Sequence, residues 1–330
     1  MRFQIFIACL FITSFSHAQQ PGYKILKTYS IKSPGGWDYI ALNNNRIYAS
    51  HGTQVNILDQ ATGDSVDVIL NTNGVHGIAF DNELKEGFTS NGRLNNVTVF
   101  NLETNKILGQ IATGENPDAI FFEPFSKMIV TCNGRSKDLS FIDPVSQKVI
   151  ATIPVGGKPE AAVSDNMGKL FVNIEDKHEV VVINTKTFTV ENHWSLKPGE
   201  SPTGLAIDRM TRRLFAGCDN KMLVVMDADN GKIIAQVSIG DGCDGVAFDE
   251  KRRVIITSNG EGNISVVKEN TANEFVQEGD YPTKRGARTL AVDKQTGLIY
   301  LPTADFGTEL NANGRPKMIP GSFQVLVVGQ

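Results

Sequence analysis

A short motif, GVHGIAFD at residues 74–81, decides the fold because it recurs along the whole chain. Each copy places an apolar triplet shortly after a variable, mostly polar position. The copies begin at intervals of 38 to 44 residues and read WDYIAL (37–42), VHGIAF (75–80), PDAIFF (117–122), PEAAVS (159–164), PTGLAI (202–207), CDGVAF (243–248) and ARTLAV (287–292). Seven units of this length indicate one repeat architecture.

Three further segments follow the apolar triplet in each unit. They are a β-rich stretch such as KLFVN (169–173), an alternating stretch such as EVVVINT (179–185) and, after a turn, a last stretch such as KVIATIPV (148–155). Alternation with period two, interrupted by Gly, Asn and Asp turns, favours strands over helices. Four strands per unit predict the blade of a β-propeller.

The two ends of the chain predict how the propeller closes. The seventh unit has its strands near 289–293, 298–301 and 324–329, and then the chain stops one strand short. The segment YKILKTYSI (23–31) precedes the first unit and can supply the missing strand, which removes the open sheet edges. We therefore expect an all-β, seven-bladed β-propeller over residues 19–330, its last blade closed by the N-terminal strand.

Composition and the N-terminus bear on location and partners. The chain has 330 residues, is 41% hydrophobic and carries a net charge of −4, so nucleic acid is an unlikely partner. Residues 1–18 have Arg2, an apolar run at 3–15 and a small-x-Ala end, which predicts a cleaved signal peptide and a periplasmic or secreted protein. The run is too short to span a membrane. We expect a monomer.

Cys132, Cys218 and Cys243 remain after cleavage, and an odd number leaves at least one thiol unpaired. Disulfide bonds are therefore not expected to hold the fold together. Cys132 follows a strand-like run and is expected to be a small core residue.

The stretch DLSFIDPVSQKVIATIPVGGKPE (138–160) resembles the YVTN-family β-propeller repeat of exported bacterial proteins, and within that family the YncE-like group. The resemblance covers roughly residues 23–330. It implies the fold, but it implies no single activity, because such propellers carry many different functions.

The repeat places two sets of positions at one mouth of the central channel. The first ring precedes the inner strands and comprises Asp38, His76, Asp118, Glu160, Thr203, Asp244 and Arg288. The second ring ends the second strands and comprises His51, Asn91, Asn133, Ile174, Cys218, Asn259 and Thr303. Twelve of the fourteen positions are polar beside apolar triplets, which predicts a functional mouth.

Crowded carboxylates in an enclosed mouth require cations or hydrogen bonds. His51 and His76 with Asp118 and Glu160 offer a nitrogen and oxygen ligand set for a divalent metal ion. Arg93 and Arg135 can hold a carboxylate or phosphate. The predicted ligand-binding residues are Asp38, His51, His76, Asn91, Arg93, Asp118, Asn133, Arg135, Glu160, Asp244, Asn259 and Arg288. A metal ion, an organic or peptide ligand and a water-filled structural channel all remain open.

The long connection at 302–323 should lie on the same face, either as a lid or as a surface loop. The chain has no GxSxG, CxxC or HExxH motif. We therefore expect a binding or scaffold protein for a small polar molecule, a metal ion or a peptide segment. The alternatives are a metal-dependent lactonase-like hydrolase or lyase that uses the same mouth, and an interaction platform without a small-molecule site.

Overall fold

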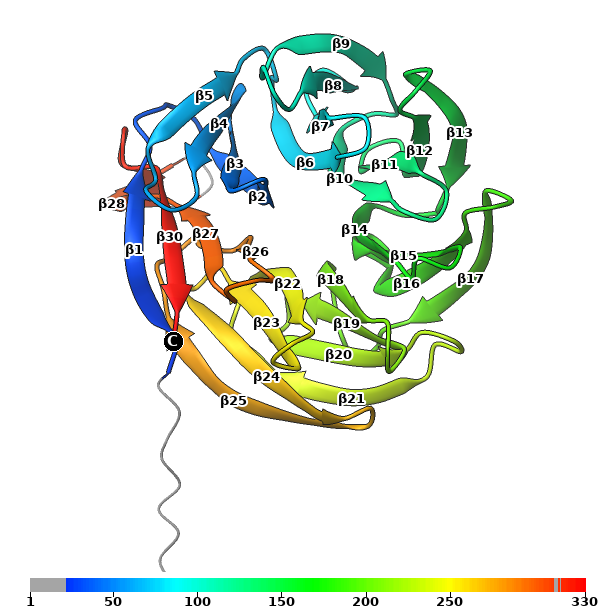
Figure 1. Ribbon diagram of the computed structural model, residues 1–330. Helices are drawn as coiled ribbons and strands as arrows, with labels where there is room; N and C mark the ends of the chain where they lie inside the picture. The colour runs from blue at the N-terminus through cyan, green and yellow to red at the C-terminus, as the bar shows by residue number, and fades with distance from the viewer. Residues whose placement is uncertain (1–21, 312–313, 315) are drawn as a thin grey trace, which may run out of the picture.

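The computed structural model describes residues 22–311, 314 and 316–330, and this part of the chain forms seven four-stranded antiparallel sheets arranged as a β-propeller (Figure 1). The predicted all-β, seven-bladed fold is confirmed. The predicted signal peptide, residues 1–18, lies outside the described residues. No helix in the described part is long and apolar enough to cross a membrane.

The sheets stand around a common axis, and the first strand of each repeat is innermost (Figure 1). The innermost strands are β2 (Trp37–Asn43), β6 (Val75–Asp81), β10 (Pro117–Glu123), β14 (Pro159–Ser164), β18 (Pro202–Asp208), β22 (Cys243–Asp249) and β26 (Ala291–Val292). The second strands are β3 (Arg46–His51), β7 (Glu86–Asn91), β11 (Met128–Asn133), β15 (Lys169–Ile174), β19 (Arg213–Cys218), β23 (Val254–Asn259) and β27 (Ile299–Thr303).

The two outer strands complete each blade. The third strands are β4 (Gln54–Asp59), β8 (Asn96–Asn101), β12 (Asp138–Asp143), β16 (Glu179–Asn184), β20 (Met222–Asp227), β24 (Asn263–Thr271) and β30 (Gln324–Gly329). The outermost strands are β5 (Ser65–Ile69), β9 (Ile107–Ala112), β13 (Lys148–Pro154), β17 (Thr189–Ser195), β21 (Ile233–Ser238), β25 (Glu274–Pro282) and β1 (Lys24–Ser30). A 3₁₀ turn, η1 (Glu175–Lys177), follows β15.

In six of the seven blades an acidic residue follows the motif and takes part in the turn that reverses the chain, and in blade 1 Asn43 stands at this position. In blade 2, Asp81 Oδ1 accepts hydrogen bonds from the N–H groups of Glu83 (3.0 Å) and Leu84 (3.1 Å). Lys85 then takes a positive φ of 57°, the conformation that closes a three- to five-residue hairpin loop. The same acceptor role falls to Asp249 in blade 6. In blades 2, 3, 5 and 6 the second strand begins five residues after this acidic residue.

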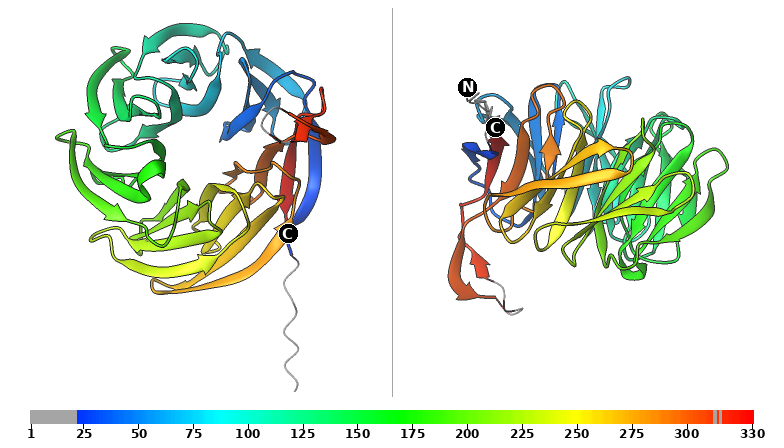
Figure 2. Two further views of the ribbon diagram at one scale, coloured as in Figure 1. Left: turned by 180° about the vertical axis from the view of Figure 1, so that it is seen from behind. Right: turned by 90° about the horizontal axis from the view of Figure 1, so that it is seen from below.

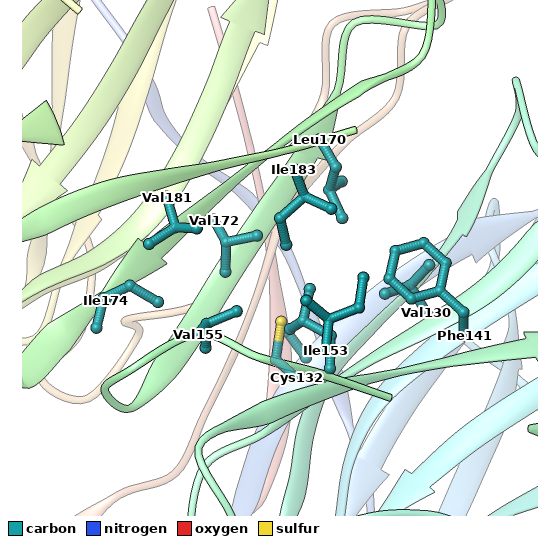
Figure 3. Close-up of a cluster of buried hydrophobic side chains, with 12 residues drawn as sticks. Val130, Cys132, Phe141, Ile153, Val155, Leu170, Val172, Ile174, Val181 and Ile183 are labelled. Atoms are coloured by element: carbon teal, nitrogen blue, oxygen red, sulfur yellow. The ribbon is translucent and has the colours of Figure 1, made fainter. Parts of the chain in front are cut away.

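The core lies between blades, because each sheet buries both faces against its neighbours. Figure 3 shows this packing between blades 3 and 4, where Phe141 and Ile153 meet Leu170 and Ile183. Cys132 is completely buried in this cluster, as expected for a small core residue. The thiols of Cys132, Cys218 and Cys243 are all free.

The N-terminal strand closes the propeller as predicted. β1 pairs antiparallel with β30, so the seventh sheet has the order β1-β30-β27-β26 and joins both ends of the chain (Figure 1). Tyr29 and Ile31 pack into the hydrophobic cluster of blades 7 and 1. Closure of the propeller therefore depends on the N-terminal segment for both hydrogen bonds and core contacts.

The long connection of the seventh blade is a β-hairpin. Its strands are β28 (Phe306–Leu310) and β29 (Pro316–Met318), which pair with each other. Figure 2 shows that the hairpin stands out from the disc of blades. The described part of the connection is therefore folded, and Phe306 and Pro316 reach the mouth of the channel.

Deletion of residues 22–31 should destabilise the protein by several kcal/mol, since burial of one large apolar side chain contributes roughly 1.5–3 kcal/mol and β30 becomes an open edge. Thermal unfolding followed by circular dichroism measures the loss, and a peptide of residues 22–31 added in trans should restore part of it. Lys24→Ala, on the exposed side of β1, is the matched control. An unchanged unfolding temperature after the deletion would contradict closure by β1.

Candidate functional site

All seven residues of the first ring line one cavity of about 780 Å³ at the mouth of the channel. They are Asp38, His76, Asp118, Glu160, Thr203, Asp244 and Arg288. The structure thus brings together seven positions that lie up to 250 residues apart in the chain. Lys158, Glu175, Asp219 and Arg285 add further charges to the wall.

A β-bulge in the inner strand places the ring residue of each of the first six blades. In blade 2 the register between β6 and β7 shifts between Val75 and Ile78. His76 and Gly77 therefore lie together opposite a single residue, Ser90. Bulges bend a strand and redirect side chains, often beside functional sites. Here the shift turns the polar residue toward the mouth while the apolar triplet behind it stays in the core.

Hydroxyl groups of neighbouring blades fix the backbone of the ring. Ser90 Oγ donates a hydrogen bond to the backbone carbonyl of Asp118, and Ser258 Oγ does the same for Arg288. Thr289 Oγ1 donates to the carbonyl of Asp38 at 2.5 Å, across the junction of blades 7 and 1. The ring is therefore tied from blade to blade, and its side chains start from fixed positions.

Opposite charges alternate around half of the ring. Arg288 lies between two carboxylates, with Nε 3.1 Å from Asp244 Oδ2 and Nη2 3.4 Å from Asp38 Oδ1. His76 Nδ1 lies 2.5 Å from Asp38 Oδ2 and 3.7 Å from Asp118 Oδ1. The imidazolium form of His76 would therefore bridge two carboxylates in the way that Arg288 does.

Over the whole cavity the carboxylates outnumber the cations. Six carboxylates line the cavity against three permanent cations and one histidine. Lys158 Nζ lies 3.1 Å from Glu160 Oε2 and also contacts Glu175. No hydrogen-bond donor with good geometry reaches Asp118 Oδ1 or Glu160 Oε2, although both atoms are buried in the described structure. Asp118, Glu160 and Asp244 form the acidic sector of the mouth, where burial and mutual repulsion disfavour the charged forms of the carboxyl groups.

The pKa values of the titratable ring residues reflect their burial and the closeness of other charges. Burial, reinforced by the charge of Asp38, raises the pKa of Asp118, and burial together with Asp118 raises the pKa of Glu160. Burial also raises the pKa of Asp244 to about 6, although Arg288 opposes the shift. Burial disfavours the charged form of His76, but its hydrogen bond to Asp38 and the charge of Asp118 outweigh this and raise its pKa to about 8.

Tyr39 interacts electrostatically with the ring carboxylates, although it does not line the cavity, and the sequence reasoning missed it. It extends from β2 of blade 1 and packs against the hydrophobic cluster of blades 3 and 4. Burial and the negative charges of Asp118 and Glu160 raise the pKa of its phenol well above the usual range. The repeat carried a signal, because the other six copies of the motif have Gly, Ala or Thr at this position.

The structure corrects the prediction for His51, which does not join His76 as a metal ligand. Its ring is fully buried and stacks on Phe323 at 3.9 Å between centroids. Its Nε2 lies 2.7 Å from the carbonyl of Gly35 and its Nδ1 2.5 Å from Ser33 Oγ. A carbonyl can only accept, so Nε2 donates and Nδ1 accepts. Both nitrogens are occupied, and burial lowers the pKa of the ring.

The prediction that the second-ring asparagines bind a ligand is also corrected, because their side-chain amides lie inside the blades. In blade 3, Asn133 Oδ1 accepts from Thr131 Oγ1 at 3.0 Å, and Nδ2 donates to Asp138 at 2.7 Å and to Ser140 at 2.9 Å. Asn91 and Asn259 make the corresponding bonds in blades 2 and 6. The Thr-x-Asn pattern thus ties the second strand to the third.

Arg93 and Arg135 are exposed and do not line the cavity. The predicted anion contacts of these two arginines therefore do not belong to the mouth. Arg285, which the sequence reasoning passed over, is the exposed arginine in the cavity wall, beside Phe306 of the hairpin. Trp37 packs against that phenylalanine at 6.0 Å between ring centroids and gives the wall an aromatic edge.

Three residues of the described chain come close enough to share a metal ion. Asp38, His76 and Asp118 each offer a ligand atom, and these atoms all lie within 4.8 Å of one another. The set predicted from the sequence shares His76 and Asp118 with this group. Asp38 takes the place of His51, while Glu160 lies outside the group and pairs with Lys158.

The fold and the cavity define a seven-bladed β-propeller with a polar mouth. No family model matches the chain, and no curated protein matches it. Among solved structures, a chain of Kuenenia stuttgartiensis hydrazine synthase, also a seven-bladed propeller, is similar at a TM-score of 0.72 with 13% sequence identity. The match covers 82% of this chain and 94% of that chain. At this identity the likeness shows the fold alone.

Asn133→Ala should lower the free energy of unfolding by roughly 1–3 kcal/mol, because it leaves buried partners in blade 3 without hydrogen bonds. Chemical denaturation measures the change. Asn192→Ala, on the exposed outer strand β17, is the matched control and should change stability by less than about 0.5 kcal/mol. Equal stability of the two variants would show that the Thr-x-Asn bonds contribute nothing.

Stability should fall as the pH rises from 4.5 to 8.5. The folded pKa values of Asp118, Glu160, Asp244 and His76 are raised, so the folded state binds more protons than the unfolded chain. These four groups stabilise the fold fully at pH values below their pKa values in the unfolded chain. The contribution is lost as the pH rises through the folded-state pKa, which is about 6 for Asp244 and about 8 for His76. The expected loss is on the order of 2–4 kcal/mol.

Denaturant unfolding at a series of pH values measures this slope. Asp118→Asn combined with Glu160→Gln should flatten it, since neither amide titrates. Carboxylates with lowered pKa values, such as Asp59 and Asp143, act in the opposite direction but at lower pH. A slope that stays unchanged in the double variant would mean that the mouth does not control it.

Proposed function

We propose that this protein is an exported β-propeller of the YVTN-repeat, YncE-like kind that binds a small, positively charged ligand at the mouth of its channel. The observation that carries the proposal is the acidic sector, where Asp118 and Glu160 are buried and Asp244 is half-buried, in a cavity whose six carboxylates exceed its three cations and one histidine. A cationic ligand would neutralise this charge where it is least solvated. The motif of residues 1–18 supports export.

The shape of the cavity is consistent with a small ligand. A volume of about 780 Å³ lies within the range of small-molecule sites, roughly 300–1,000 Å³. Trp37 and Phe306 provide an aromatic edge on one side, and the acidic sector provides charge on the other. Both a metal ion and an organic ammonium group suit this wall.

The competing function, a lactonase-like hydrolase or lyase, receives no support from the cysteines of the site. Cys243 lines the cavity but is only 1% exposed, and burial raises the pKa of its thiol well above the usual range. Burial raises the pKa of Cys218 to about 12. Both thiols are therefore protonated at neutral pH and are poor nucleophiles, which favours binding over covalent catalysis.

Isothermal titration calorimetry of the mature protein tests the proposal with agmatine, spermidine and choline, with the chlorides of Mg²⁺, Mn²⁺ and Zn²⁺, and with citrate as an anion. At least one cation should bind with one-to-one stoichiometry, and citrate should not bind. Asp118→Asn combined with Glu160→Gln should weaken binding of the cation by at least roughly fivefold, because two groups that can face it as carboxylates become neutral amides.

Glu250→Gln, an exposed carboxylate outside the cavity, is the control and should leave the affinity unchanged. Absence of binding by every cation would overturn the proposal. An equal loss in the control variant would also overturn it, because the attraction would then come from the whole surface.

A further inference from the structure

We propose that the cation is a divalent metal ion held by one ligand from each of three consecutive blades, Asp38, His76 and Asp118. The inference rests on the proposed function, since it names the cation that the mouth would bind. The ligand atoms are Asp38 Oδ2, His76 Nδ1 and Asp118 Oδ1, and their separations are the observation from which the site is built.

The three atoms nearly have the spacing of a metal site. An ion with bonds of about 2.0–2.2 Å to imidazole nitrogen and carboxylate oxygen holds these atoms roughly 3–4 Å apart. The separation of 3.7 Å between His76 Nδ1 and Asp118 Oδ1 already fits. The separation of 2.5 Å between His76 Nδ1 and Asp38 Oδ2 is that of a hydrogen bond. It must widen as the Nδ1–H proton leaves to solvent and a nitrogen–metal bond replaces it.

The carboxylate of Asp118 is the second, independent indication of a ligand. The residue is only 8% exposed, and its Oδ1 atom is buried without a hydrogen-bond partner in the described structure. A buried carboxylate oxygen is normally satisfied, because leaving it unpaired costs about 1–3 kcal/mol or more. The unpaired atom faces His76 Nδ1, so a metal ion between them would satisfy it.

Neighbouring blades hold the three ligands in place. The carbonyls of Asp38 and Asp118 accept hydrogen bonds from Thr289 and Ser90, so the two carboxylates extend from fixed backbone. Arg288 Nη2 approaches the second oxygen of Asp38 at 3.4 Å and leaves Oδ2 for the ion. Such outer contacts orient metal ligands and tune their affinity.

The ligand set suggests which metals would bind. One imidazole nitrogen with two carboxylate oxygens suits Zn²⁺ or Mn²⁺ better than Mg²⁺ or Ca²⁺, which prefer oxygen alone. Three protein ligands leave at least one coordination position, and the cavity of about 780 Å³ lies in front of it. Water or a small organic ligand can occupy that position, as in other open metal sites.

The test begins with mature protein stripped by EDTA and dialysed, then titrated with ZnCl₂ and MnCl₂ by calorimetry, with elemental analysis after gel filtration. One equivalent of Zn²⁺ or Mn²⁺ should remain bound. Asp118→Asn and His76→Gln should each lower the affinity by at least about tenfold. Asp244→Asn, which removes a charge from the same mouth outside the ligand set, should lower it by less than about threefold.

Cobalt provides a readout that general electrostatic attraction would not produce. Co²⁺ bound through nitrogen should give a visible absorption band in the parent protein, and His76→Gln should abolish or shift it. Circular dichroism establishes that each variant is folded. If Asp118→Asn does not fold, His76→Gln alone decides the result.

The outcomes separate the two proposals. An equal loss of affinity in Asp118→Asn, His76→Gln and Asp244→Asn would overturn the three-ligand site but keep a cation-binding mouth. If agmatine or choline binds and no metal ion binds, the three-ligand site is likewise overturned and the cation-binding mouth is kept. His76 would then act only as a counter-ion to the carboxylates. If neither metals nor organic cations bind, both proposals fail.

Discussion

The pairing of β1 with β30 is the interaction on which the rest of the structure depends. Once this strand joins the two ends of the chain, the seven repeats share one axis and equivalent residues meet around it. The contact of Arg288 with Asp38 and the hydrogen bond from Thr289 to the same residue cross this junction. Closure thus completes both the sheet and the charged ring, so the site forms only when the whole propeller has formed.

Within the closed ring, the balance between burial and charge sets the chemistry of the mouth. Between Asp244 and Asp118 on one side, Arg288 and His76 alternate with carboxylates. On the other side Thr203 takes the place of a charged residue, and Glu160 depends on Lys158, which it shares with Glu175. Burial is the largest cause of the raised pKa values of Glu160 and Asp244, and repulsion between carboxylates adds to it, while Lys158 and Arg288 offset only part of the shift.

Residues that build the scaffold recur from repeat to repeat, whereas several residues of the site occur only once. Turn residues such as Asp81 and the Thr-x-Asn bonds of Asn133 recur because each blade needs them to fold. His76, Tyr39 and the hairpin after β27 occur once, in a position or form that the other repeats do not share. A propeller fold supports many activities, so these departures from the repeat carry more information about function than the repeat does.

The sequence by itself determined the number of blades, the closing strand and the first ring, because a period of about 42 residues and strands of period two leave few other arrangements. It could not place the second ring. The repeat fixes where a residue stands along a strand, but the register and twist of the folded sheet decide which way its side chain points. His51 and Asn133 turned into the protein, where hydrogen bonds hold them. Asp38 lies close to His76 and Asp118 because β-bulges in three blades direct the three side chains toward one another.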